Sequence, residues 1–237
     1  MNLPTTLPVA IVLALIAFAC GGATLSGQQE GTKPSSLVPA PRTDEWAIKR
    51  QDELLRRARE SDQANVLFVG DSITQSWEDP GRQAWTKHIA PLGALNLGNS
   101  GDRTENVLWR LEQAPLTRLG AKHVVLLIGT NNLGHGTSNA QETLAGIQAV
   151  ATMLADQCKD ARIHILEVFP RGERFNAMRG DICQINQAMR AWVAAQAGDR
   201  FAIHAIGDGF LNADGSISKD IMPDFLHLTP KGYEMWA

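Results

Sequence analysis

Short apolar runs alternate with longer amphipathic stretches along most of the chain. The apolar runs are nearly continuous rather than interrupted by polar residues at every second position. Such runs are typical of strands that are covered on both faces of a parallel sheet. We therefore predict five strands, at residues 66–69, 94–97, 123–128, 163–169 and 201–206.

The stretches around these runs have apolar residues at helical spacing. One opens at Thr43, a candidate N-cap, and in another Val107, Leu108 and Leu111 share one face. Strands and helices that alternate in this way predict an open, doubly wound α/β sheet. The longer predicted helices occupy residues 43–61, 103–113, 139–158 and 179–197.

The first 19 residues have the form of a signal peptide. An apolar run of about 12 residues, short for a bilayer span, ends in Ala17-Phe18-Ala19, a small-x-small cleavage pattern. Cys20 follows, as in bacterial lipoproteins, although Leu is typical where this chain has Ala17, and Lys and Arg are absent before the run. We expect export to the periplasm or the extracellular space. Lipid anchoring through Cys20 stays open, and an uncleaved anchor is the alternative.

Residues 20–43 are rich in Gly, Ser, Gln and Pro, so we predict a flexible tether ahead of a folded domain at 44–237. That domain contains Cys158 and Cys183. They could pair in an oxidising compartment, but their spacing indicates neither a disulfide framework nor a zinc site. Each is expected to be a small core residue.

The bulk composition excludes one class of partner. The chain has 237 residues, an apolar fraction of 44% and a charged fraction of 20%, which fit one ordinary globular domain. The net charge of −3 comes without a basic block, so nucleic acid is not an expected partner. The sequence does not indicate an oligomeric state, and a homodimer stays open.

Polar, glycine-containing segments directly follow the first three predicted strands, at residues 70–76, 98–104 and 129–132. A fourth follows the next strand, at 170–176. In open α/β sheets, ligands bind at the carboxyl ends of the strands. We therefore expect the first three segments to meet at one edge of the sheet.

Ser72 lies in the first segment, on an expected strand-to-helix turn that would expose its hydroxyl. In isolation it is more typical of a helix cap than of a nucleophile. A serine nucleophile needs a base, and His227 is the best candidate, with Asp224 three residues before it. On one turn, this spacing lets the carboxylate accept from Nδ1–H and leaves Nε2 toward a substrate. Alone, such a pair is more often a helix entry.

Acyl transfer also needs hydrogen-bond donors at the developing oxyanion. The candidates are the N–H of Ser72, the N–H of Gly101 and the side-chain amide of Asn131. Gly101 has no side chain, so its backbone could approach a ligand closely. Taken one at a time, Gly101 and Asn131 would be ordinary turn residues.

Together these segments resemble the SGNH, or GDSL-type, hydrolase family, whose four blocks contain Ser, Gly, Asn and His. The corresponding blocks here are VGDSIT with Ser72, GNSGDRT with Gly101, GTNN with Asn131, and DFLHLT with Asp224 and His227.

This resemblance extends from about residue 65 to 237 and is greater still to the catalytic subunits of platelet-activating factor acetylhydrolase. LWRL (108–111), PRGE (170–173) and ADGSIS (213–218) are similar to that group. Asn132 departs from the wider family, where Asp is common, and the sequence stops at GYEMWA, where relatives continue a helix. We expect this last helix to pack Tyr233 and Trp236 against the sheet.

The resemblance implies a three-layer α/β/α, flavodoxin-like fold with a central five-stranded parallel sheet, and a serine esterase mechanism. Ser72 would attack an ester carbonyl, His227 would transfer the proton, and Asp224 would orient His227. Ser72, Gly101 and Asn131 would bind the oxyanion, and no metal or cofactor is required. Because bacterial relatives often remove acetyl groups from carbohydrates, the expected substrate is a small-molecule or carbohydrate acetyl ester.

Ile73 and Leu226 are next to the candidate nucleophile and base in the sequence. If both point into the acyl pocket, they leave room for acetyl and crowd longer chains. Three other functions stay open: a non-catalytic sugar- or acyl-binding module on the same fold, a phosphate or nucleotide binder that uses residues 70–76, and lipase or thioesterase chemistry.

Overall fold

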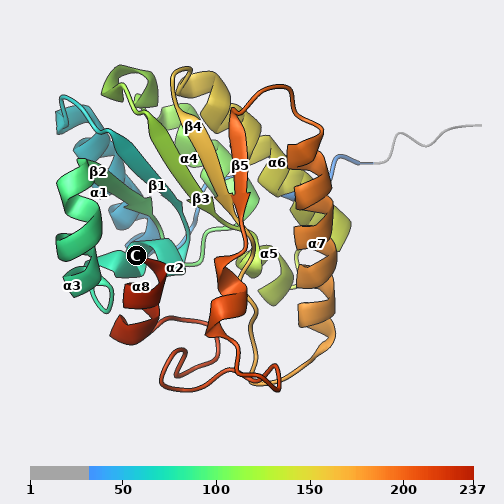
Figure 1. The fold of residues 1–237 in the computed structure, drawn as a ribbon. Helices are drawn as coiled ribbons and strands as arrows, with labels where there is room; N and C mark the ends of the chain where they lie inside the picture. Colours follow the sequence, from blue (N-terminus) through green and yellow to red (C-terminus); the bar gives the residue numbers. More distant parts are fainter. Residues whose placement is uncertain (1–31) are drawn as a thin grey trace, which may run out of the picture. The chain divides into compact units, whose positions relative to one another are not determined.

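The computed structural model describes residues 32–237, which contain a five-stranded parallel sheet with helices on both faces (Figure 1). The strand order is β2-β1-β3-β4-β5, so the direction of winding reverses beside β1. Each predicted strand is present, and the predicted three-layer α/β fold is confirmed. The strands are β1 (Val66–Gly70), β2 (Ala94–Gly98), β3 (His123–Leu127), β4 (Arg162–Leu166) and β5 (Phe201–His204).

The four longer predicted helices are also present: α1 (Glu45–Glu60), α4 (Thr104–Gln113), α6 (Ala140–Gln157) and α7 (Ala177–Ala194). Sequence periodicity did not reveal the short helices, because a few residues do not show a helical period. These are α2 (Ser72–Gln75), α3 (Arg82–Ala84), α5 (Thr130–Gly134) and α8 (Pro230–Trp236). Single 3₁₀ turns lie at Ser35–Leu37, Ser76–Glu78, Ala90–Leu92, Leu116–Leu119 and Ile206–Phe210, and a π-helical turn at Trp85–Ile89.

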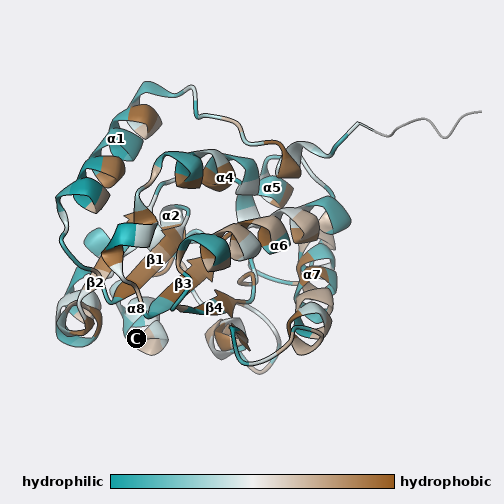
Figure 2. Ribbon diagram, turned by 90° about the horizontal axis from the view of Figure 1, so that it is seen from above, coloured by the Kyte–Doolittle hydropathy of each residue, from teal (hydrophilic) through white to brown (hydrophobic). Residues whose placement is uncertain are grey.

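One face of the sheet is covered by α1, α4, α6 and α7. Successive side chains of a strand point to opposite faces, and those on this face join the helices in the larger apolar cluster. In Figure 2 the strands are mostly hydrophobic, whereas α1 and α6 have both hydrophobic and hydrophilic residues. The fully buried strand residues on this face are Leu67, Val69, Val124, Leu126, Ile163 and Ile165.

The opposite face is covered over β1 by an aromatic cluster. Trp77 contacts Phe68, Tyr233 and Trp236 with ring centroids 4.6–6.1 Å apart. Tyr233 is fully buried, and its hydroxyl donates to the carbonyl oxygen of Ile73 at 2.6 Å. The predicted packing of the last helix against the sheet is therefore confirmed.

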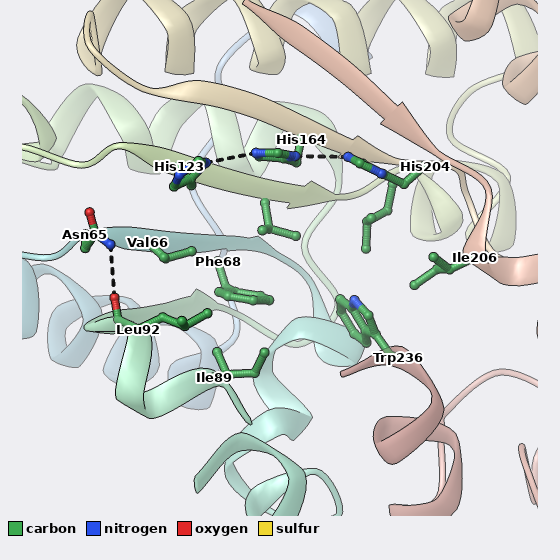
Figure 3. A pocket seen from close by; sticks show the side chains of 12 residues that line it. Asn65, Val66, Phe68, Ile89, Leu92, His123, His164, His204, Ile206 and Trp236 are labelled. Carbon is green, nitrogen blue, oxygen red and sulfur yellow. Dashed lines mark hydrogen bonds between the residues drawn. The ribbon is translucent and has the colours of Figure 1, made fainter. Parts of the chain in front are cut away.

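The rest of this face is an open trough of about 460 Å³ beside β3, β4 and β5 (Figure 3). Three histidines line one side in a row: His123 Nδ1 lies 3.0 Å from His164 Nε2, and His164 Nδ1 lies 2.9 Å from His204 Nε2. Burial and the two neighbouring imidazoles lower the pKa of His164 to about 4, so its ring is neutral at neutral pH. Residues of β5 are all partly exposed, so the expectation that strands are covered on both faces is wrong there.

Residues 33–43 fall in the predicted tether, yet they pack against the domain. Their 3₁₀ turn contacts α4 and α6, and the buried Ser36 donates to the carbonyl oxygen of Glu142 at 2.7 Å. The compact unit thus begins at Lys33 rather than at residue 44. Composition did not reveal this, because the contacts include hydrogen bonds to backbone as well as apolar packing. The predicted leader, the rest of the tether and Cys20 lie outside the described residues.

The two cysteines of the domain are unpaired. Cys158 is buried in the larger apolar cluster, as predicted, whereas Cys183 is exposed, so its assignment to the core is wrong. The apolar face of α7 contains Ile182, Ile185 and Met189, and Cys183 lies off that face. Among residues 32–237, no helix has both the length and the apolar character that a membrane span requires.

Candidate active site

The polar segments after β1, β2 and β3 meet at the carboxyl edge of the sheet, as predicted. Two glycines make this close approach possible. A Cβ at Gly98 would lie 2.3 Å from the backbone nitrogen of Gln75, and a Cβ at Gly70 would lie 2.3 Å from the carbonyl oxygen of Leu127. A side chain at Gly98 would collide with the end of α2, and one at Gly70 would collide with β3 and with Thr74 of α2.

Ser72 and His227 are 155 residues apart in the sequence but in direct contact in the structure. Ser72 Oγ lies 2.8 Å from His227 Nε2, and His227 Nδ1 lies 2.6 Å from Asp224 Oδ2. When Nδ1–H donates to the carboxylate, Nε2 is free to accept from the serine hydroxyl. This is the arrangement that activates a serine as a nucleophile.

A tight turn, rather than a helix entry, holds Asp224 and His227 together. The other carboxylate oxygen of Asp224 accepts from the N–H of Leu226 at 3.1 Å and from the N–H of His227 at 2.8 Å. The turn requires a φ of 60° at Phe225, a left-handed conformation that is strained for a bulky residue. The N–H of Gly172 stabilises it by donating to the Phe225 carbonyl oxygen at 2.8 Å.

The carboxylate of Asp224 stays ionised in this turn. Partial burial alone would raise its pKa, but hydrogen bonds from the imidazole and the N–H of His227 outweigh burial and hold the pKa below its ordinary value. The side chains of Asp224 and His227 are 52% and 38% exposed, so a substrate can approach the pair from solvent.

Asp71 caps α2 and orients the serine. Its Oδ1 accepts from the N–H of Ile73 at 3.0 Å, which fixes the turn in which Ser72 is the first helical residue. The N–H of a first helical residue has no partner within the helix, so that of Ser72 is free for an oxyanion.

The other two candidate oxyanion donors lie on the adjacent loops. Gly101 has a φ of 74°, and within residues 32–237 its N–H donates to no other residue. Asn131 is nearly buried in α5, and its amide donates one hydrogen to the Asp102 carbonyl oxygen at 2.9 Å. Its second amide hydrogen leaves it able to act as a donor to a ligand.

Three charged residues that sequence reasoning missed support these loops. Asp102 is buried and accepts from Arg110 at 3.1 Å. Arg171, from the segment after β4, donates to the carbonyl oxygen of Thr130 at 3.1 Å and so links that segment to α5. Their roles depend on burial and on distant partners, and neither is visible in a local sequence pattern.

Asp71 is also unusual because it is fully buried with one unpaired oxygen. Within the described residues, its Oδ2 has no hydrogen-bond partner. Burial raises the pKa of this carboxyl to about 7, helped by the nearby Asp102 and opposed by the N–H of Ile73 and by Arg171. The folded protein therefore holds the Asp71 proton more tightly than the unfolded chain, where the pKa is near 3.8.

This shift predicts a loss of stability as pH rises. Below the unfolded-state pKa the proton is bound in both states, and the penalty for burying the charge grows until the pH passes the folded-state pKa. Asp71→Asn keeps the capping oxygen and cannot ionise. We expect its melting temperature to fall less than that of the wild type between about pH 5 and about pH 8. The exposed Asp156→Asn is the control; identical slopes for wild type and Asp71→Asn would contradict the prediction.

A polar cavity of about 370 Å³ adjoins Gly101. The larger trough of Figure 3 contains none of the candidate catalytic residues, whereas the polar cavity is lined by one candidate oxyanion residue, Gly101. No set of three or more His, Cys, Asp or Glu side chains in residues 32–237 is arranged to hold a metal ion. The cavity is lined by Pro41, Arg42, Thr43, Asp44, Gly101, Arg103, Asn106 and His135.

The two residues predicted to line an acyl pocket lie on one side of the site. Ile73 is 1% exposed and packs in the aromatic cluster with Trp77, and Leu226 is partly buried against the same cluster. The structure thus brings the two together but places Ile73 in the core.

The chain is similar to known proteins. The model of the GDSL-like Lipase/Acylhydrolase family matches residues 68–235. Platelet-activating factor acetylhydrolase IB subunit alpha1 from Homo sapiens is 38% identical over 168 residues, which cover 71% of this chain and 70% of that protein.

Two solved structures show the same fold. A GDSL-like lipase from Bacteroides thetaiotaomicron is 18% identical with a TM-score of 0.65, and the match covers 80% of this chain and 94% of that one. A carbohydrate acetylesterase from Sinorhizobium meliloti is also 18% identical, with a TM-score of 0.54 and coverage of 73% and 94%. At these identities the likeness concerns the fold alone.

Proposed function

The chain belongs to the GDSL-like lipase/acylhydrolase family, and from this premise we propose that it is a serine esterase that hydrolyses acetyl and other short-acyl esters. The observation that supports the proposal most directly is the contact of Ser72 Oγ with His227 Nε2 at 2.8 Å, with Asp224 hydrogen-bonded behind the imidazole.

In the proposed mechanism, Ser72 Oγ attacks the ester carbonyl while His227 Nε2 accepts its proton. The resulting imidazolium is stabilised by the Asp224 carboxylate, and it then donates the proton to the leaving alcohol as the carbon–oxygen bond breaks. A water molecule then attacks the acyl carbon of the acyl-enzyme. His227 takes a proton from the water and returns it to Ser72 Oγ as the bond from Oγ to the acyl carbon breaks. The products are the free acid and the alcohol.

The oxyanion of each tetrahedral intermediate would accept hydrogen bonds from the N–H groups of Ser72 and Gly101 and from the Asn131 amide. These donors are held by the cap at Asp71, by the loop after β2 and by α5, so little reorganisation is needed as negative charge develops. A phosphate-binding loop is less well supported, because it leaves the hydrogen-bonded pair of Asp224 and His227 without a role.

We propose that the alcohol part of the substrate is polar, with carbohydrate O-acetyl esters as the main candidates. The cavity beside Gly101 offers guanidinium, amide, hydroxyl and imidazole groups, which suit sugar hydroxyls better than a lipid chain. Two proteins similar to this chain are named for acetyl esters, an acetylhydrolase and a carbohydrate acetylesterase. Export and anchoring through Cys20 remain predictions beside this proposal.

An ester panel tests the proposal. We expect p-nitrophenyl acetate to be turned over at least about tenfold faster than p-nitrophenyl octanoate, since each excess methylene in a confined pocket costs about 1–3 kcal/mol. We also expect acetylated xylan to release acetate faster than an acetyl phospholipid does. Equal rates for acetyl and octanoyl esters would rule out acyl selectivity.

A labelling experiment distinguishes an esterase from a non-catalytic binding module. A fluorophosphonate probe should label the wild type at Ser72, because only an activated serine reacts quickly. Sugar binding without labelling and without ester turnover would favour the non-catalytic module.

A further inference from the structure

Residues 33–44, which we call the strap, run along the outside of the loop that contains Gly101. The N–H of Ala40 donates to the Glu105 carbonyl oxygen at 3.1 Å, and Asn106 donates back to the Ala40 carbonyl oxygen at 3.0 Å. Thr104 donates to the Ser36 carbonyl oxygen at 3.0 Å. The strap is thus hydrogen-bonded to the start of α4, immediately after the Gly101 loop.

Arg42 of the strap contacts the residues on both sides of Gly101. Its Nη1 donates to the Ser100 carbonyl oxygen at 2.8 Å and lies 3.4 Å from Asp102 Oδ1. Its Nη2 pairs with Asp44 at 2.7 Å, and the side chain is only 12% exposed. A Cβ at Gly101 would lie 3.0 Å from Nη1, so the guanidinium group rests directly against this glycine.

Through Asp102, Arg42 is also connected to Asn131 of α5. The carbonyl oxygen of Asp102 accepts from the Asn131 amide at 2.9 Å, while its carboxylate is held by Arg110 on the other side. Asp102 is 1% exposed. Arg42 therefore supports two of the three proposed oxyanion donors. It contacts the residues on both sides of the Gly101 N–H, and it contacts Asp102, which binds the Asn131 amide.

We propose that Arg42 is a positioning residue for the oxyanion site, and that the strap is consequently part of the catalytic apparatus. The inference rests on the proposed esterase function. Donors aimed at an oxyanion lose much of their effect when they are displaced by a fraction of a bond length. Because the oxyanion exists only in the transition state and the intermediates, the loss should appear in kcat rather than in KM.

Arg42→Gln tests this role. We expect kcat for p-nitrophenyl acetate to fall by about 10- to 100-fold. KM should change by less than about threefold, because this ester has no sugar hydroxyl that the guanidinium could bind. Arg42→Lys keeps the charge, but one ammonium group cannot reach both sides of Gly101 as a planar fork does, so its kcat should lie between those of Arg42→Gln and the wild type. Because lysine keeps the positive charge but not the planar geometry, the kcat of Arg42→Lys shows how much of the loss in Arg42→Gln is due to each.

Arg200→Gln is the matched control. Arg200 also fastens backbone carbonyl oxygens, including that of Cys158 at 2.9 Å, but it lies at the start of β5, on the opposite edge of the sheet from Ser72. We expect Arg200→Gln to lower the melting temperature and to leave kcat within about twofold of the wild type. A similar fall of kcat in both variants would show that general loosening of the fold is responsible, and would overturn the role of Arg42.

Hydrogen exchange provides a readout that does not need turnover. The N–H of Asp102 donates to the Asn99 carbonyl oxygen at 3.1 Å, so its exchange reports opening of the loop that contains Gly101. It should exchange faster in Arg42→Gln than in the wild type or in Arg200→Gln. Unchanged exchange at Asp102, or a kcat of Arg42→Gln within twofold of the wild type, would overturn the inference. A wild type that turns over no ester, but whose Asp102 exchange still depends on Arg42, would overturn the proposed function and leave the positioning role of Arg42 supported.

Discussion

Replacing Ser72 with alanine is expected to lower kcat for p-nitrophenyl acetate by at least about 10⁴-fold, close to the uncatalysed rate. The hydroxyl that contacts His227 Nε2 at 2.8 Å is the only protein group in the proposed mechanism that forms a bond to the acyl carbon. Without it, the imidazole could at best activate water. Initial rates with purified wild type and variant give the ratio, and the variant should also lose fluorophosphonate labelling.

Ser76→Ala is the control for this experiment. Ser76 follows α2 directly, four residues after Ser72, but no histidine is among its hydrogen-bond partners in the described part of the chain. We expect it to retain most of the wild-type kcat. Residual activity of Ser72→Ala above about a tenth of the wild type would show that another nucleophile performs the chemistry.

Asp224→Asn is expected to reduce kcat by about 10⁴-fold, the size of effect that follows when a catalytic imidazole is held in the wrong tautomer. An asparagine oxygen could still accept from the N–H groups of Leu226 and His227, so the turn should keep its shape. The amide NH₂ would then face Nδ1 in place of Oδ2 and would favour the tautomer with the proton on Nε2. That nitrogen could no longer take the proton of Ser72.

Asp214→Asn is the matched control for this substitution. Asp214 also closes a turn, with its Oδ1 accepting from the N–H of Ser216 at 3.0 Å, but its hydrogen-bond partners within residues 32–237 include no histidine. Its kcat should stay near that of the wild type. If Asp224→Asn loses less than tenfold while its melting temperature is unchanged, Asp224 does not set the tautomer of His227.

Periodicity and local motifs predicted most of the fold. The five strands and the four long helices each contain enough residues to show a period. The site blocks could also be predicted, because Ser72, Gly101, Asn131 and His227 each follow a strand or occupy a short motif. The convergence of the first three then follows from the rule that ligands bind at the carboxyl ends of parallel strands, whereas the resemblance implied the place of His227.

What the sequence could not show depends on contacts between distant residues. Arg42 and Asp102 are 60 positions apart, and neither stands in a pattern that links it to the other. The unpaired oxygen and raised pKa of Asp71 result from complete burial, which no local motif predicts. The exposed side of β5 was missed because a continuous apolar run does not reveal how far the covering helices extend.

The contact between Ser72 and His227 joins the first strand of the sheet to the last turn before α8, and Tyr233 locks that helix to the carbonyl oxygen of Ile73. A nascent chain can therefore have no complete catalytic centre until the segment that contains His227 and α8 has been synthesised and has docked. Hydrolytic activity would then report on completed folding.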